Sequence, residues 1–164
     1  MSIIKVDEVQ DLAGKKILQN TGSVLQVVNT KNITAPSSTT SSSFTATGVK
    51  VAITPTSSSS KILVCFTSTV NVQAATAWVD VTLYRDGSTN LALTDSTNAD
   101  GFCGHYNQGS TDTHVPCSAI VLDSPATTSE VEYEIYFRSR NNSTQVRFNP
   151  DQFTNSISAI EISA

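Results

Sequence analysis

Two cysteines and two histidines that lie close together in the sequence are the clearest candidates for metal chemistry. The four residues are Cys103, His105, His114 and Cys117. Thiolate and imidazole groups are the ligands that zinc prefers, and four of them complete a tetrahedral site. However, the single residue between Cys103 and His105 is a shorter gap than structural zinc sites usually have. Loop histidines beside two ordinary cysteines explain the pattern better, so the sequence predicts no metal and no cofactor.

Three cysteines are too few for a disulfide framework, and their odd number leaves at least one without a partner in the same chain. Cys65 lies in a predicted strand and is expected to be a small, buried or half-buried apolar residue. Cys103 and Cys117 either pair with each other or remain free thiols, and the sequence leaves both alternatives open.

Carboxylates occur in several predicted strands and turns, but their sequence context does not indicate catalysis. They are Asp80, Asp86, Asp95, Asp100 and Asp112. A glycoside hydrolase needs two carboxylates held about 5–10 Å apart, whereas carboxylates in turns usually stabilise the turn itself. The sequence also lacks a Gly-x-Ser-x-Gly motif for a nucleophilic serine and a glycine-rich loop for phosphate. We therefore expect a protein without enzymatic activity.

Aromatic residues next to amides form a second candidate site, a surface for binding sugars. This group consists of Phe102, His105, Tyr106, Asn107 and Gln108. Aromatic rings stack on sugar faces while amides bond to the hydroxyl groups. Packing between subunits favours the same residue types, and both interpretations stay open for this stretch. For Trp78 and Tyr84 we expect packing.

The low charge of the chain argues against several classes of function. Charged residues make up 15% of the 164 residues, and the net charge is −4. A nucleic-acid-binding protein needs a basic stripe facing the phosphates, and the 10 lysines and arginines are scattered. No apolar run approaches the ~20 residues that span a bilayer, and the first residues lack the pattern of a secretory signal. We expect no nucleic-acid or membrane partner, and synthesis in the cytoplasm without export.

Alternation of apolar and polar residues predicts a chain built of β-strands. In residues 62–72 the even positions are mostly apolar and are expected to face a core, which places Leu63 and Cys65 on the outward side. Residues 130–138 alternate most regularly, with Val131, Tyr133, Ile135 and Phe137 predicted to point inward. Further strands are predicted at residues 24–29, 44–53, 77–85, 90–93, 117–122, 144–148 and 157–162.

Turn residues separate these segments, which number about eight to ten, and no convincing helix is present. Such a pattern is typical of a β-sandwich or a barrel. Residues 34–43 are rich in serine and threonine and are predicted to form a loop, as are residues 94–116. Long loops within compact domains are often functional, so the second loop is where we expect a binding surface.

Residues 1–22 differ from the rest of the chain and are predicted to be a segment separate from the sandwich domain at residues 23–164. Charges are closely spaced here, and the apolar residues are Ile3, Ile4, Val6, Val9, Leu12, Ile17 and Leu18. The spacing of Val6, Val9 and Ala13 fits an amphipathic helix. The β-branched side chains favour short extended pieces instead, and this is the form we expect. Because the segment has too little apolar surface to fold alone, it needs a partner.

Three pieces of the sequence occur in the same order as in a known protein family. They are KVDEVQDLAGKKILQNTGSVLQVV at residues 5–28, TGVKVAITPTSSSSKILV at 47–64, and DSPATTSEVEYEIYFRSRNNSTQVRFN at 123–149, followed by the terminal ISAIEIS. In these pieces the chain resembles small virion proteins of tailed phages that infect cyanobacteria and other aquatic bacteria. The resemblance covers both ends and the middle of the chain and weakens across residues 94–116.

The resemblance implies a non-enzymatic structural protein on the outside of a phage particle, in the manner of a tail fibre or similar appendage. The form it implies is a homotrimer of jelly-roll-like antiparallel sandwiches, in which residues 1–22 attach each chain to other proteins of the tail or capsid. We then expect outward apolar side chains such as Leu63 and Cys65 to be buried between copies. Loops far from the attachment segment are expected to contact glycan on the host surface.

Two other functions fit the same sequence features. In a capsid decoration protein, the same trimer would stabilise the head shell and would need no receptor. A lectin-like binding module is the third class, and the missing export pattern disfavours it.

Overall fold

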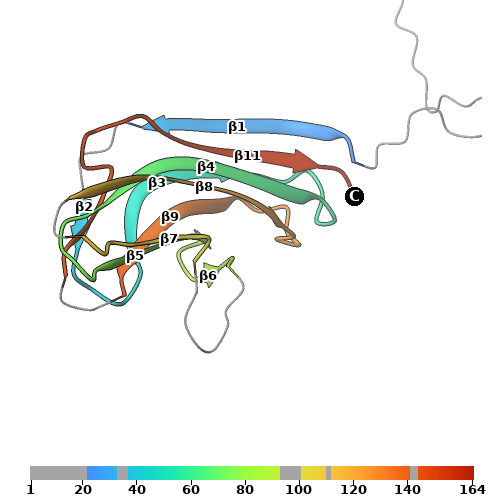
Figure 1. Cartoon of the computed structure of the whole chain (residues 1–164). Helices are drawn as coiled ribbons and strands as arrows, with labels where there is room; N and C mark the ends of the chain where they lie inside the picture. The colour runs from blue at the N-terminus through green and yellow to red at the C-terminus, as the bar shows by residue number, and fades with distance from the viewer. Residues whose placement is uncertain (1–21, 33–36, 93–100, 110–111, 141–143) are drawn as a thin grey trace, which may run out of the picture.

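The computed structural model describes residues 22–32, 37–92, 101–109, 112–140 and 144–164. These residues form two antiparallel β-sheets that pack face to face, one above the other in Figure 1. The six-stranded sheet contains β1 (Val24–Asn32), β2 (Ser37–Thr39), β4 (Lys61–Val72), β8 (Thr113–Asp123), β10 (Val146–Phe148) and β11 (Asn155–Ile162). The five-stranded sheet contains β3 (Thr45–Ile53), β5 (Trp78–Arg85), β6 (Thr89–Asn90), β7 (Cys103–Tyr106) and β9 (Val131–Ser139). The predicted all-β sandwich is confirmed.

The order of the strands is that of a jelly roll. Along one side of β4, β11 pairs with the first part of the strand and β10 with the last part, while β8 covers the other side. If β1 with β2, β10 with β11, and β6 with β7 are each taken as one interrupted strand, both sheets have four strand positions. The chain then crosses between the sheets at every step except from β5 to β6 and β7, which is the double Greek key of a jelly roll.

The core lies between the sheets and is built from the alternating residues that the sequence predicts. The inward residues of β4 are Ile62, Val64, Phe66, Ser68, Val70 and Val72, and all of them are buried. The inward residues of β9 are Val131, Tyr133, Ile135 and Phe137, which are buried as well. Successive side chains of a strand point to opposite faces, so each of these strands gives one face to the core and one to the outside.

A polar contact near one end of the core also joins the two sheets. Asp123 of β8 accepts a hydrogen bond from the Tyr133 hydroxyl of β9 at 2.8 Å. The same carboxylate lies 2.8 and 2.9 Å from Nη1 of Arg85 on β5. Burial, together with the neighbouring carboxylate, raises the pKa of Tyr133, so its hydroxyl remains a donor. The contact fixes one end of β8 against the five-stranded sheet.

Two predicted loops contain strands in the structure. Within residues 34–43, Ser37–Thr39 forms β2 and pairs with β10. Within residues 94–116, Cys103–Tyr106 forms β7 beside β5, and β8 already begins at Thr113. The predictions were wrong because these strands lie at sheet edges, where backbone pairing with an inner strand is enough and apolar alternation is weak. The described residues contain no helix, as expected.

Replacing Phe66 with Ala should lower the free energy of unfolding by about 3–5 kcal/mol, because it removes a ring from the packed core. Phe66 is 4% exposed and belongs to the main hydrophobic cluster. Its neighbour Thr67 points outward and is exposed, so Thr67→Ala is the matched control and should change stability by less than about 0.5 kcal/mol. Urea unfolding followed by circular dichroism measures both values. A loss below about 1 kcal/mol for Phe66→Ala would contradict the inward orientation of Phe66.

Candidate functional site: the outer face of the six-stranded sheet

Outward side chains on four neighbouring strands of the six-stranded sheet form a continuous apolar surface. The strand register places Val27, Ile160, Leu63 and Leu122 in one row across β1, β11, β4 and β8. Cys65 and Ile120 are paired in the adjacent row, and Val24 pairs with Ile162 on the other side. We call this surface the apolar face; its residues are Val24, Val27, Leu63, Cys65, Ile120, Leu122, Ile160 and Ile162. The predicted outward orientation of Leu63 and Cys65 is confirmed.

Several residues of the apolar face are more exposed than large apolar side chains usually are. Ile120 is 73% exposed, Val27 61%, Val24 60% and Leu122 54%. Single exposed apolar residues are common on proteins, whereas contiguous ones mark surfaces that another molecule covers. The apolar face therefore has the properties of an interaction surface.

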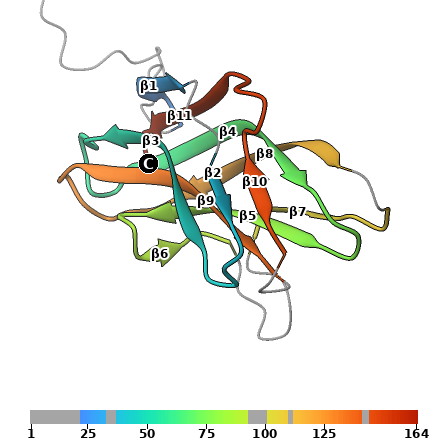
Figure 2. The ribbon, with the colours of Figure 1, turned by 90° about the vertical axis from the view of Figure 1, so that its left-hand side faces the viewer.

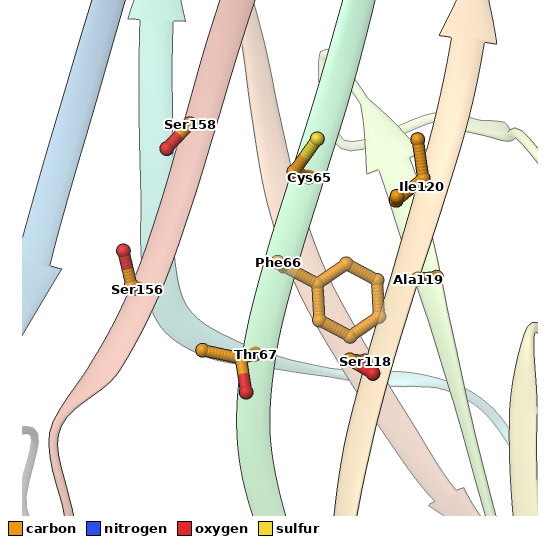
Figure 3. Close-up of a pocket in the computed structure, with 8 residues that line it drawn as sticks. All are labelled: Cys65, Phe66, Thr67, Ser118, Ala119, Ile120, Ser156 and Ser158. Atoms are coloured by element: carbon orange, nitrogen blue, oxygen red, sulfur yellow. The ribbon is translucent and has the colours of Figure 1, made fainter.

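A shallow hollow of about 540 Å³ lies next to the apolar face on the same side of the sheet (Figure 3). Its lining residues are Cys65, Phe66, Thr67, Ser118, Ala119, Ile120, Ser156 and Ser158. Small outward side chains in adjacent rows of β11, β4 and β8 leave this space, and Cys65 and Ile120 border both features. Apart from the Cys65 thiol, the lining has no side chain that titrates, so the hollow suits a side chain of a binding partner better than a reaction.

A buried carboxylate beneath the apolar face holds β1 in place. Glu161 of β11 points inward and accepts a hydrogen bond from the Gln26 side chain of β1 at 2.6 Å. The backbone N–H and the hydroxyl of Thr56, in the turn after β3, donate to its other oxygen at 2.7 and 2.8 Å. Burial by itself would raise the pKa of Glu161, but the hydrogen bonds outweigh it and lower the pKa to about 2. Glu161 thus positions the strand that carries Val24 and Val27.

The five residues predicted to bind sugar do not form one exposed surface. Phe102 packs partly against the core, and Asn107 is buried, where it donates a hydrogen bond to the Val72 carbonyl at 3.2 Å. The Nε2 atom of His105 is also buried. Tyr106 is half-buried, and Gln108 is exposed. Phe102 and His105 are half-buried like Tyr106, so Asn107 is the one residue of the five that is fully buried.

The outer face of the five-stranded sheet carries an ion cluster that the sequence reasoning missed. Asp80 is buried and bonded at 2.6 and 2.9 Å to Nη2 and Nε of Arg140, and at 3.0 Å to Nε of Arg138. The Arg140 guanidinium lies 4.5 Å from the centre of the Trp78 ring, which also stacks on Tyr106 at 4.7 Å. Charge-assisted bonds and cation–π contacts of this kind fix the side chains to one another. The cluster therefore holds outward side chains of β5 to Arg138 and Arg140 on this face of the sheet.

Tyr84 belongs to the same face and packs against aromatic rings of its own chain. Its ring lies 4.4 Å from that of Tyr136 and 6.0 Å from that of Phe44. Phe44 in turn lies 4.5 Å below the guanidinium of Arg138. The strand register that brings these residues together cannot be read from the sequence of β5 or β9 alone.

The four candidate zinc ligands do not converge in the structure. Cys103 packs against the core cluster that includes Cys117, and both are free thiols in the structure. His114 points to the outside of β8, where its Nδ1 lies 2.7 Å from a carboxylate oxygen of Asp151. Across the part of the chain that the structure describes, no group of three or more His, Cys, Asp or Glu side chains is arranged to hold a metal ion.

The apolar residues predicted to form the attachment segment, from Ile3 to Leu18, lie outside the described residues. The first described residue, Gly22, donates its N–H to the Ser163 carbonyl at 2.8 Å. Gly22 therefore lies close to Val24 and Ile162, at the border of the apolar face. In the described ranges, no helix is long and apolar enough to cross a membrane.

No protein-family model matches the chain, and no curated protein matches it.

Replacing Glu161 with Gln should destabilise the fold by about 2 kcal/mol at pH 7, because charged hydrogen bonds to Gln26 and Thr56 are lost. The pKa of Glu161 is about 2 in the folded chain, below its ordinary value of 4.5. Ionised Glu161 therefore stabilises the fold above pH ~4.5, and this contribution is lost as the pH falls toward ~2. The stability difference between wild type and variant should shrink over that range.

Thermal and urea unfolding at several pH values between 2 and 7, followed by circular dichroism, measures this difference. Glu130→Gln is the control, because Glu130 is exposed. A difference between wild type and Glu161→Gln that stays constant from pH 7 to pH 2 would show that the ionised carboxylate is not what holds β1.

Proposed function

We propose that this chain is a non-enzymatic structural protein of a phage particle, displayed on its surface as a tail fibre or similar appendage and assembled as a homotrimer. The observation that carries the proposal is the apolar face, with four residues more than half exposed on β1 and β8, the strands at its two borders. Apolar surface of this kind gains about 25 cal/mol for each Å² that is covered. An exposed apolar face of this kind is expected on a subunit that assembles with other copies.

The partner we propose for the apolar face is another copy of the chain. Most soluble oligomers consist of identical subunits related by closed symmetry. The number three comes from the resemblance to small phage virion proteins, which are expected to be trimers of jelly rolls. The jelly roll is also an architecture that viral capsid and lectin domains use. The hollow beside Cys65 and Ile120 would receive side chains from the neighbouring copy.

The buried carboxylates support a structural role over a catalytic one. Asp80 bonds to two arginines, and Asp123 to Arg85 and Tyr133. Glu161 is engaged by Gln26 and Thr56. Each carboxylate accepts hydrogen bonds from residues of other strands or turns. None of the three lines the hollow. A catalytic pair, in contrast, would face a space where substrate binds.

The attachment segment and the glycan surface complete the proposal. The attachment segment precedes Gly22, which lies at the border of the apolar face, and would bind another tail or capsid protein. Tyr106, whose ring lies against Trp78, and the exposed Gln108 are the positions we propose for contact with a host glycan. In the alternative role, a decoration protein of the head, the same trimer needs no glycan contact and occurs in many more copies per particle than a tail appendage.

Replacing Ile120 with Glu should dissociate the trimer without unfolding the chain. Ile120 lies on β8, the strand at one edge of the apolar face, and is already exposed in one chain, so the isolated fold tolerates a charge there. In an interface, an unpaired buried carboxylate costs about 3 kcal/mol or more. Sedimentation velocity of the full chain should give a trimer for the wild type and a monomer for the variant, with the same far-ultraviolet circular dichroism.

Thr128→Glu adds the same charge on an exposed turn and is the matched control. It should leave the trimer intact. A wild-type chain that sediments as a monomer at tens of micromolar, or an Ile120→Glu trimer as stable as the control, would contradict the proposed interface.

Deleting residues 2–16 should give a soluble trimer that no longer joins particles, because the apolar residues of the attachment segment are removed. Mass spectrometry of particles purified from cells that express the shortened gene measures how much of the protein is incorporated. The full-length gene supplied in the same way is the control. Incorporation of the shortened chain at the normal level would mean that the segment does not attach the protein.

A further inference from the structure

Cys103 and Cys117 belong to different sheets and meet at one edge of the sandwich. β7, which carries Cys103, pairs with β5 of the five-stranded sheet, and β8, which carries Cys117, pairs with β4 of the six-stranded sheet. Figure 2 shows β7 and β8 along the same edge of the sandwich. The Cys103 Sγ atom lies 3.4 Å from the carbonyl oxygen of Ser118, the residue after Cys117. Cys117 belongs to the hydrophobic core and Cys103 packs against it, and both are free thiols in the structure.

Along this edge, hydrogen bonds between the sheets come from Asp123 at the end of β8, which bonds to Arg85 and Tyr133, and from the residue after β7. β7 is four residues long and pairs with β5 over those four residues. Asn107, just after β7, reaches the Val72 carbonyl of β4 with its side chain. A covalent bond between the thiols would add a permanent connection between the two sheets at this point.

We propose that Cys103 and Cys117 form an intramolecular disulfide bond that joins the two sheets when the protein is exposed to an oxidised thiol such as oxidised glutathione. The third cysteine is not part of this pair, because Cys65 lies on the apolar face, on the outside of β4. The proposal does not depend on the virion role. If that role is correct, the bond forms after particles leave the reducing cytoplasm, since disulfides persist in oxidising surroundings.

The two thiols differ in exposure and in pKa, as stepwise thiol–disulfide exchange requires. Cys103 is half-buried, whereas Cys117 is only 2% exposed. The hydrogen bond from the Cys117 thiol lowers the pKa of Cys103, and the pKa of Cys117 is raised by Cys103 and by burial. Cys103 is therefore the thiol that reaches the oxidant and supplies a thiolate, and Cys117 is the one that completes the bond.

The exchange proceeds in two balanced steps. The Cys103 thiolate attacks one sulfur of oxidised glutathione, the glutathione S–S bond breaks, and one glutathione thiolate leaves. Cys117 then releases its proton to solvent and attacks the Cys103 sulfur, which displaces the second glutathione thiolate. The two protein thiols are oxidised to one disulfide, and one oxidised glutathione is reduced to two glutathione molecules.

The experiment uses the full chain with Cys65→Ser, so that Cys103 and Cys117 are the two remaining cysteines. The protein is equilibrated with mixtures of oxidised and reduced glutathione, quenched with acid, alkylated and digested. We expect a peptide that links Cys103 to Cys117 within one chain, no alkylated thiols, and a chain mass lower by two hydrogens. Closing the loop between these residues should raise the Tm by roughly 5–10 °C, and dithiothreitol should reverse the change.

The controls carry a second substitution, Cys103→Ser or Cys117→Ser, and should show no linked peptide and no rise in Tm on oxidation. The main result does not depend on whether the control variants fold, because the linked peptide and the Tm are measured on the Cys65→Ser chain alone. Alkylation of both cysteines in the oxidising mixture would overturn the proposal. So would glutathione bound separately to each cysteine, or linked peptides that join different chains. None of these outcomes bears on the trimer or on incorporation into particles.

Discussion

The structure depends most on β4, a strand of twelve residues that is hydrogen-bonded along both sides. Its two-residue period sends one set of side chains, among them Val64 and Phe66, into the core. The other set, among them Leu63 and Cys65, points outward into the apolar face. Because β8 and β11 are in register with β4, their outward apolar residues extend this face on both sides. The same alternation therefore produces the core of one chain and the surface that we propose joins several chains.

Polar side chains fix the geometry that the apolar packing leaves undetermined. Asp123 ties β8 to β5 and β9, and Glu161 ties β1 and the turn after β3 to β11. Asp80 does the same for β5 and β9 through two arginines. Buried carboxylates are stable only when hydrogen bonds or opposite charges compensate them, and each of these has several partners. Although the chain has few charged residues, three of its carboxylates hold strands to one another.

Much of the fold could be predicted from the sequence, because alternation within a strand is a local property. The inward residues of β4 and β9 were predicted correctly, and so was the two-sheet sandwich. The strands β2 and β7 were missed because edge strands are held by backbone pairing, and their residues, such as Ser38 and Gly104, carry little apolar signal. Helical and extended alternatives for residues 1–21 stay open, since these lie outside the described residues.

The candidate site was harder to predict because it is a property of register between strands. Leu63 and Cys65 were expected to point outward, but nothing in the sequence indicates that Leu122 and Ile160 flank Leu63. In the same way, residues 102–108 look like one surface in the sequence, yet the fold buries Asn107 and leaves Gln108 exposed. Chemistry that depends on residues from several strands can be assigned only after the strands are paired.

The central claim is that the chain is an exterior subunit of a phage particle whose copies cover one another's apolar faces. Electron cryomicroscopy of intact particles, with reconstruction of tail and head, tests this claim most directly. The account predicts jelly-roll density on the outside of the tail, in groups of three, with the outer faces of the six-stranded sheets turned toward neighbouring copies. Density over the capsid would assign the decoration role instead. Particles without this chain, or copies whose apolar faces are turned to solvent, would contradict the account.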